Sequence, residues 1–163
     1  MRWWPVLLAA LTFPASAAWT EGETSDGDLY AATTNDDGQV LAQFCTVADA
    51  TCQWVLVTQD TCEVGKTRTP TLISAPAGAT SATMACLSTT PSGGKTLYRL
   101  GFYPFDSVDA AFRQTGIVGI AIPLESGQFR VVRFSLVGGT AVIDRMRDRV
   151  MKKQQTSTRG QTL

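Results

Sequence analysis

The stretch GDLYAATTNDDGQVLAQFCT, residues 27–46, contains two alternating segments joined by a turn sequence. In LYAATT (29–34) and QVLAQFC (39–45), apolar and polar residues alternate with the period of two that is typical of β-strands. Between them, NDDG (35–38) supplies residues that favour a tight turn. The stretch therefore predicts a β-hairpin near the start of a β-rich domain.

The hairpin ends in Cys45, the first of four cysteines, which are Cys45, Cys52, Cys62 and Cys86. Their spacings of seven, ten and twenty-four do not match structural zinc sites, and there is no C-x-x-C redox motif. An even number of cysteines in an exported chain predicts two disulfides. Of three possible connectivities we favour Cys45–Cys52 and Cys62–Cys86, because Cys45 ends one predicted strand and Cys52 begins the next.

Export is predicted by the first seventeen residues. Arg2 is followed by an apolar run from Trp3 to Phe13 and by Ala15-Ser16-Ala17, the small-x-small pattern of a signal peptidase site. The run is shorter than the roughly 20 residues that span a bilayer as a helix. We therefore expect residues 1–17 to be a signal peptide and the protein to be periplasmic, on the outer surface or secreted.

The remaining pattern predicts more strands and two short helices. Strands are expected at 53–58, 71–74, 82–88, 95–103, 117–122 and 129–136, and helices at 105–116 and from 141 to 150. Asp106 or Ser107 is expected to cap the first helix and Gly116 to end it. The fold class is thus α+β, mainly an antiparallel β-sheet or sandwich with two short helices. The chain is expected to form one disulfide-stapled domain over residues 18–151. Polar loops are expected at 63–70 and 89–94. The polar segment at the start of this domain is expected to be flexible, and it contains Glu21, Glu23, Asp26 and Asp28.

Charge is distributed unevenly along the chain. Residues 18–144 contain thirteen acidic and seven basic residues, a net charge of −6, whereas residues 145–163 contain six basic residues and one acidic residue. An acidic body argues against nucleic-acid binding. Residues 152–163 lack apolar periodicity and are expected to be a disordered basic tail. The basic residues of this end either contact anionic lipid headgroups weakly or interact favourably with the carboxyl end of the preceding helix through its dipole.

The chain contains no histidine, which excludes Ser-His-Asp and Cys-His catalysis. Paired carboxylates are the remaining hydrolytic chemistry, with Asp106 and Asp109 on the first predicted helix as candidates. Their spacing of three also fits a capping role at a helix amino end. We expect no catalytic site, metal or cofactor, and keep a carboxylate hydrolase as a distant alternative.

Binding to a protein is the function that this composition favours. GFYPF (101–105) is the most aromatic stretch, and Phe102, Tyr103 and Phe105 are either a binding surface or core residues. EVGKTRTPT (63–71), with Lys66 and Arg68, could be the rigid loop of an inhibitor of a secreted hydrolase.

The segment from Phe105 to Met146 resembles the end of the invasion-associated locus B family of α-proteobacterial envelope proteins. The resemblance rests on a helix that ends in glycine, two strands, and a SLxGFxxA-like entry into a last helix. Gly139 stands where the family has an aromatic residue, and the cysteines lie earlier in this chain. The resemblance implies a periplasmic or surface-associated, non-enzymatic protein, of a kind linked in some members to host-cell entry, and the family has no shared catalytic site. The matching residues are Val108, Ala111, Gly116, Ser135, Leu136, Gly138, Ala141 and Ile143.

Overall fold

A computed structural model describes residues 18–65, 69–124 and 126–160, so the predicted signal peptide lies outside the described residues. The strands are β1 (Thr20–Glu23), β2 (Leu29–Thr34), β3 (Val40–Cys45), β4 (Cys52–Thr58), β5 (Thr69–Ala75), β6 (Gly78–Ser92), β7 (Lys95–Tyr103), β8 (Ile117–Pro123) and β9 (Phe129–Ser135). The helices are α1 (Phe105–Phe112) and α2 (Gly139–Gly160). The strands form one antiparallel sheet in the order β1-β2-β3-β4-β7-β6-β5-β8-β9, which confirms the predicted class.

The predicted NDDG hairpin is the pair β2–β3, with Leu29 opposite Cys45 at its open end. In the turn, the Asn35 N–H donates to the Gln39 carbonyl at 3.0 Å, and Asn35 Oδ1 accepts from the Gln39 N–H at 2.9 Å. Gly38 has a φ of +74°, in the left-handed region that glycine adopts without a Cβ clash. The side chain of Asn35 and the glycine together set the register of the hairpin.

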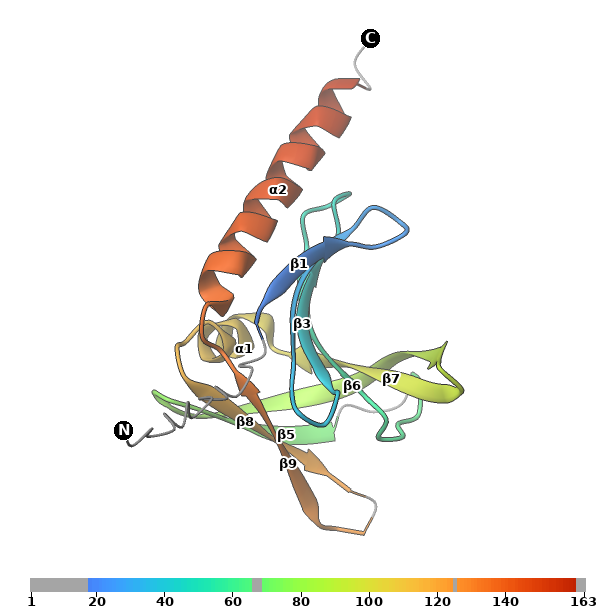
Figure 1. The fold of residues 1–163 in the computed structure, drawn as a ribbon, viewed down its shortest axis with the longest axis vertical. Coiled ribbons are helices and arrows are strands. Elements are labelled where there is room, and N and C mark those ends of the chain that lie inside the picture. The colour runs from blue at the N-terminus through green and yellow to red at the C-terminus, as the bar shows by residue number, and fades with distance from the viewer. Residues whose placement is uncertain (1–17, 66–68, 125, 161–163) are drawn as a thin grey trace, which may run out of the picture.

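The sheet is a single curled layer, and α1 lies against its inner face (Figure 1). Phe112 of α1 is the centre of the core, with its ring centroid 4.9 Å from Trp54 on β4 and 5.3 Å from Phe102 on β7. All three aromatic side chains are fully buried. Val108, Ala111 and Phe112 form the buried face of α1, as the helical spacing predicts. The curl follows from wrapping the apolar inner face around this helix.

The second helix begins at Gly139 and packs mainly against β2. Ile143, Met146 and Val150 lie at helical spacing on one side of α2 and are buried against the sheet. Figure 1 shows the carboxyl-terminal half of α2 extending past the sheet. At 22 residues, α2 is longer than the short helix that the sequence predicts.

The prediction of a disordered tail over residues 152–163 is wrong for residues 152–160, which continue α2. Adding residues to a helix that is already anchored by packing costs little, because only the first turn carries the nucleation penalty. Lysine, glutamine and arginine are also good helix formers. Residues 161–163 lie outside the described part of the chain.

The prediction of a flexible leader is also wrong, because Thr20–Glu23 forms β1. This strand pairs with β2, with Glu21 opposite Ala31. Its Glu21 and Glu23 side chains form ion pairs with α2 at Arg149 and Lys153. The polar sequence gives no strand periodicity, so β1 depends on partners that are distant in the sequence.

Several element boundaries also differ from the predictions. The expected loop at 89–94 is mostly strand, since β6 extends to Ser92 and the turn is reduced to Gly93 and Gly94. The first helix has Pro104 at its amino cap with no side-chain cap hydrogen bond, and it ends at Phe112. The predicted cap at Asp106 or Ser107 and the predicted end at Gly116 are therefore wrong.

Candidate functional site

The two disulfides have the predicted connectivity. Cys45–Cys52 joins directly opposed residues of β3 and β4, with a Cα–Cα distance of 4.0 Å. Cys62–Cys86 ties the loop after β4 to β6, with a Cα–Cα distance of 5.8 Å. Both cross-links restrict the unfolded chain and have no partner thiol for exchange, because all four cysteines of the sequence are paired. Two structural disulfides indicate an oxidising, extracytoplasmic compartment.

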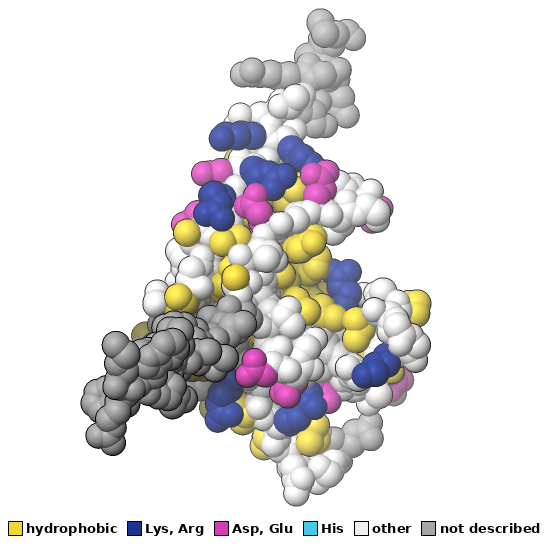
Figure 2. Space-filling model, viewed as in Figure 1, with side chains coloured by type: hydrophobic (Ala, Val, Ile, Leu, Met, Phe, Trp, Pro, Cys, Tyr) yellow, Lys and Arg dark blue, Asp and Glu magenta, His cyan; other side chains and the backbone are white. Residues whose placement is uncertain are grey.

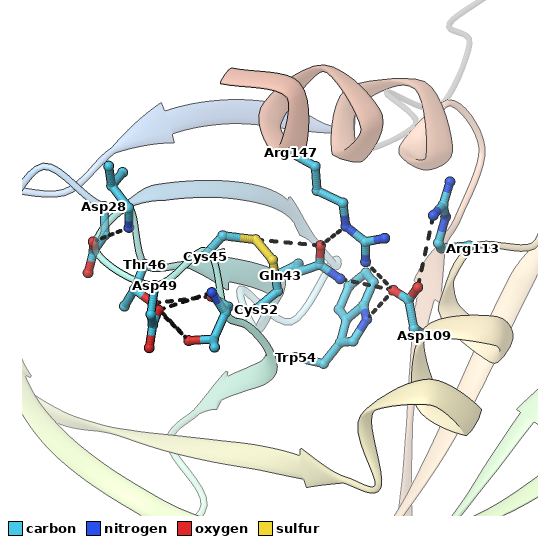
Figure 3. Close-up of a disulfide and its surroundings, with 12 residues drawn as sticks. Asp28, Gln43, Cys45, Thr46, Asp49, Cys52, Trp54, Asp109, Arg113 and Arg147 are labelled. Atoms are coloured by element: carbon cyan, nitrogen blue, oxygen red, sulfur yellow. Dashed lines mark hydrogen bonds and ion pairs between the residues drawn. A yellow bond between two sulfur atoms is a disulfide. The ribbon is translucent and has the colours of Figure 1, made fainter. Parts of the chain in front are cut away.

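A carboxylate junction lies beside the first disulfide, centred on Asp109 of α1 (Figure 3). Its Oδ1 accepts hydrogen bonds from Gln43 Nε2 at 3.0 Å and from Trp54 Nε1 at 2.9 Å. Arg147 Nη2 donates to the same oxygen at 2.6 Å. The contacts place β3, β4 and α2 around one carboxylate of α1.

The remaining polar atoms of this junction are also occupied. Arg147 Nε donates to Gln43 Oε1 at 2.7 Å, and Arg113 lies 3.9 Å from Asp109 Oδ2. The Cys45 sulfur lies 3.9 Å from Gln43 Oε1, a van der Waals contact because a disulfide sulfur carries no proton. Across the described residues, no buried side-chain nitrogen or oxygen lacks a hydrogen-bond partner.

These contacts bear on the two carboxylates that the sequence offers for hydrolysis. Asp109 is surrounded by structural donors from three other elements, whereas Asp106 is exposed on α1. A catalytic acid of a glycosidase type needs a carboxyl that can exchange a proton with substrate. The arrangement instead gives Asp109 the geometry of a residue that positions α1 against the sheet and α2.

The aromatic stretch GFYPF is divided between core and surface. Phe102 is fully buried and its ring packs on Phe112, so Phe102 is a core residue and is not available to a partner. Tyr103 and Phe105 are half-buried, and the Arg147 guanidinium lies 5.7 Å from the Phe105 ring centroid. Lys66 and Arg68, predicted for an inhibitor loop, lie outside the described residues.

The basic end of the chain is partly neutralised by β1. Arg149 Nη1 lies 2.8 Å from Glu21 Oε1, and Lys153 Nζ lies 2.7 Å from Glu23 Oε1. The hydrogen bond from Lys153 lowers the pKa of the Glu23 carboxyl below its usual value of 4.5. Figure 2 shows these opposite charges alternating where α2 lies over β1. Contact between the basic tail and an anionic membrane remains a prediction.

An apolar surface that the sequence analysis missed lies on the outer side of β5, β8 and β9. Leu72, Ala121 and Val131 oppose one another in register across these three strands. Phe129 is 66% exposed and Val131 is 47% exposed on the same side of β9, and Ile117 extends the surface along β8. We call this surface the β9 face, defined by Leu72, Ile117, Ala121, Phe129 and Val131.

The β9 face lies at a free sheet edge. β9 is the last strand in the sheet order, and its one strand partner among the described residues is β8. Arg133 is exposed between the apolar part of β9 and its end at Ser135, and it has no ion-pair partner within the described ranges. An edge strand leaves one row of backbone N–H and C=O groups available to another strand. Strand β9 also contacts β2, and Trp19 Nε1 donates to the Ser135 carbonyl at the end of β9, at 3.0 Å.

A cavity of about 600 Å³ opens at the other end of the inner face from α1, beside the second disulfide. It was not predicted from the sequence. The loop after β4 and the start of β5 contribute polar residues, and strands β6, β7 and β8 contribute apolar ones. The lining residues are Asp60, Thr61, Cys62, Glu63, Thr69, Met84, Cys86, Leu100, Ile122, Pro123 and Leu124.

Other site classes receive no support from the described residues. No group of three or more possible metal-ligating side chains occurs there. None of the described helices has the length and apolar composition needed to cross a membrane. Comparison with known proteins adds no assignment, because no family model, no curated protein and no solved structure matches this chain.

Proposed function

We propose that this chain is an exported, non-enzymatic protein of the bacterial envelope that binds a protein partner through the β9 face, similar in role to the invasion-associated locus B group. The observation that carries the proposal is the coincidence of exposed Phe129 and Val131 with a strand that, among the described residues, has a strand partner on one side alone. Large apolar side chains gathered at one exposed place often mark an interaction site. The paired disulfides suit a protein that works outside the cytoplasm.

The partner that fits this surface is an extended segment that adds a strand to β9. In strand addition, backbone hydrogen bonds supply affinity and alternate side chains supply specificity. A partner strand would place apolar side chains beside Phe129 and Val131, and an acidic side chain beside Arg133. The apolar pair and the exposed Arg133 together define the chemistry of the expected segment.

The residues that carry the resemblance to the invasion-associated locus B group are core and turn residues, so they bear on a shared fold more than on a shared partner. Leu136, Val108 and Ile143 are buried, and Gly116 and Gly138 have positive φ values of +124° and +79°. The Leu136 N–H also donates to the Gly116 carbonyl at 2.7 Å, which joins the two matching segments. These positions determine how α1, β8, β9 and α2 meet. Specificity for a partner is therefore expected from residues outside the motif, such as those of the β9 face.

Site-specific photo-cross-linking tests this function. A photoreactive residue in place of Val131 should form one dominant cross-linked protein product in the native envelope. The same residue in place of Thr90, which is exposed on the distant β6–β7 hairpin, should form little or none. Equal yields from both positions, or no protein product from Val131, would argue against the β9 face as the binding surface.

A small inhibitor of a secreted hydrolase is the second candidate. It is favoured by one observation, the Cys62–Cys86 disulfide, which fixes the start of the loop that contains Lys66 and Arg68. Rigid loops lose less conformational freedom on binding an active site. Substituting both basic residues should then abolish binding to the captured hydrolase, whereas substituting Val131 should leave that binding unchanged.

A further inference from the structure

We propose that the 600 Å³ cavity beside Cys62–Cys86 binds the hydrocarbon chain of a single-chain amphiphile whose head group stays in water at the mouth. This site is separate from the β9 face, since its floor belongs to the inner side of the sheet. The inference is independent of the proposed protein-binding function.

The floor of the cavity is apolar. Met84, Leu100 and Ile122 point to the inner face and are 3%, 6% and 4% exposed. The large aromatic side chains of the core, Trp54 and Phe112, fill the other end of the inner face around α1. Medium-sized side chains thus remain to fill the space between β6, β7 and β8, and they leave a cavity.

The mouth of the cavity is polar and open. Thr61, Glu63 and Thr69 are exposed lining residues, and Asp60 accepts a hydrogen bond from Arg130 of β9. The cavity is therefore lined by apolar strand residues at its floor and by polar residues, mostly from a loop, at its mouth. A ligand with an apolar body and a polar end matches this change in polarity, as small-molecule sites of about 300–1,000 Å³ commonly do.

The lining chemistry selects an aliphatic chain over a ring. No aromatic residue lines the cavity within the described residues, so there is no platform for stacking an aryl group or a base. The deep lining residues Met84, Leu100 and Ile122 carry no hydrogen-bonding group that could recognise ring heteroatoms. Aliphatic and thioether surfaces contact a flexible alkyl chain well.

The charged lining residues bear on the head group. Asp60 is ion-paired with Arg130 of β9, so its negative charge at the mouth is compensated. A polar head group at this end would stay in water beside the exposed residues Thr61, Glu63 and Thr69. The expected ligand class is a single alkyl chain with a polar head, and phosphocholine is the head group of the probes used below.

Calorimetric titration of the oxidised mature protein with octyl-, decyl- and dodecylphosphocholine, below their micelle concentrations, tests the site. Each added methylene that enters the cavity should lower Kd by about fourfold until the chain fills the space. A Kd that does not change with chain length would overturn the proposal.

Two filling variants locate the binding. Met84→Trp should raise Kd by at least tenfold by occupying the floor, and Thr69→Trp should do the same at the exposed mouth, where the fold tolerates a larger side chain. Thr90→Trp, on the exposed β6–β7 hairpin and outside both the cavity and the β9 face, is the matched control and should bind like the parent. If Thr69→Trp folds normally and binds as tightly as the parent, the ligand lies elsewhere and the proposal fails. Cross-linking from Val131 is expected to be unaffected by Thr69→Trp, which keeps this result separate from the protein-binding function.

Discussion

Asp109 on α1 and Arg147 on α2 meet across the inner side of the sheet, with Arg147 Nη2 donating to Asp109 Oδ1 at 2.6 Å. The two side chains are 15% and 25% exposed, so the ion pair is largely removed from water. Trp54 donates to the same oxygen and ties the pair to β4. The contact joins the two helices of the fold, and it accounts for an aspartate in the middle of a helix that otherwise packs through apolar residues.

Removing this carboxylate should destabilise the fold. Asp109→Ala leaves the Arg147 guanidinium and the Trp54 N–H without their common acceptor, and we expect a loss of about 2–4 kcal/mol in the free energy of unfolding. Urea denaturation followed by tryptophan fluorescence measures this change. Asp106→Ala, at an exposed position of the same helix, should change stability by less than about 0.5 kcal/mol. Equal effects of the two substitutions would contradict the structural role of Asp109.

The two disulfides should differ in their contribution to stability. The loop-entropy relation gives about 2.4 kcal/mol for Cys45–Cys52, which closes a separation of 7 residues, and about 3.5 kcal/mol for Cys62–Cys86, which closes a separation of 24. Double Cys→Ala variants at each pair, compared by urea denaturation, test this order. A larger loss from the Cys45–Cys52 pair would show that native contacts at the β3–β4 end outweigh the chain-entropy term.

Asp49, in the turn between β3 and β4, should titrate at unusually low pH. The Thr46 hydroxyl, the Thr51 hydroxyl and the Thr51 N–H all donate to its carboxylate, and these hydrogen bonds lower its pKa to about 2 from the usual 3.8. Because the folded-state pKa is the lower one, the stabilisation is present above pH 3.8 and is lost as the pH falls through 2. NMR titration of the side-chain carboxyl carbon measures the midpoint. Thr46→Ala should raise that midpoint. An unchanged midpoint would show that the Thr46 hydroxyl is not the main cause of the low pKa of Asp49.

Gly139 should not tolerate a side chain. A Cβ at this position would lie 2.7 Å from the Trp19 ring, which is held by its hydrogen bond to the Ser135 carbonyl. Gly139→Ala is therefore expected to cost about 1–3 kcal/mol through overpacking. Thermal unfolding checks this, with Gly119→Ala as the control, where the nearest atom to a new Cβ is Val131 Cγ1 at 3.4 Å.

Local patterns in the sequence predicted the elements whose stabilisation is local. The β2–β3 hairpin contains its own turn residues, and the apolar face of α1 is visible in the spacing of Val108, Ala111 and Phe112. The disulfide pairing also followed from the predicted strand ends, because Cys45 and Cys52 had to be neighbours across a short turn.

The features that escaped prediction depend on residues far apart in the chain. Glu21 of β1 forms an ion pair with Arg149, which lies 128 positions later in the sequence. No local pattern in the sequence indicates that these two residues are neighbours. The cavity likewise depends on how strongly the sheet curls, because its floor combines Met84, Leu100 and Ile122 from three strands. The β9 face could have been suspected from the alternation of Phe129, Val131 and Arg133, but only the sheet order places that strand at an edge.

The central claim, that the β9 face binds a protein partner, is tested most directly by quantitative co-purification from the native envelope. Tagged parent protein, Val131→Glu and the control Thr90→Glu would be cross-linked and compared by mass spectrometry. We predict one protein that is enriched with the parent and with Thr90→Glu and reduced at least tenfold with Val131→Glu, because a buried unpaired carboxylate opposes strand addition. Full retention of every enriched protein by a folded Val131→Glu variant would contradict the claim.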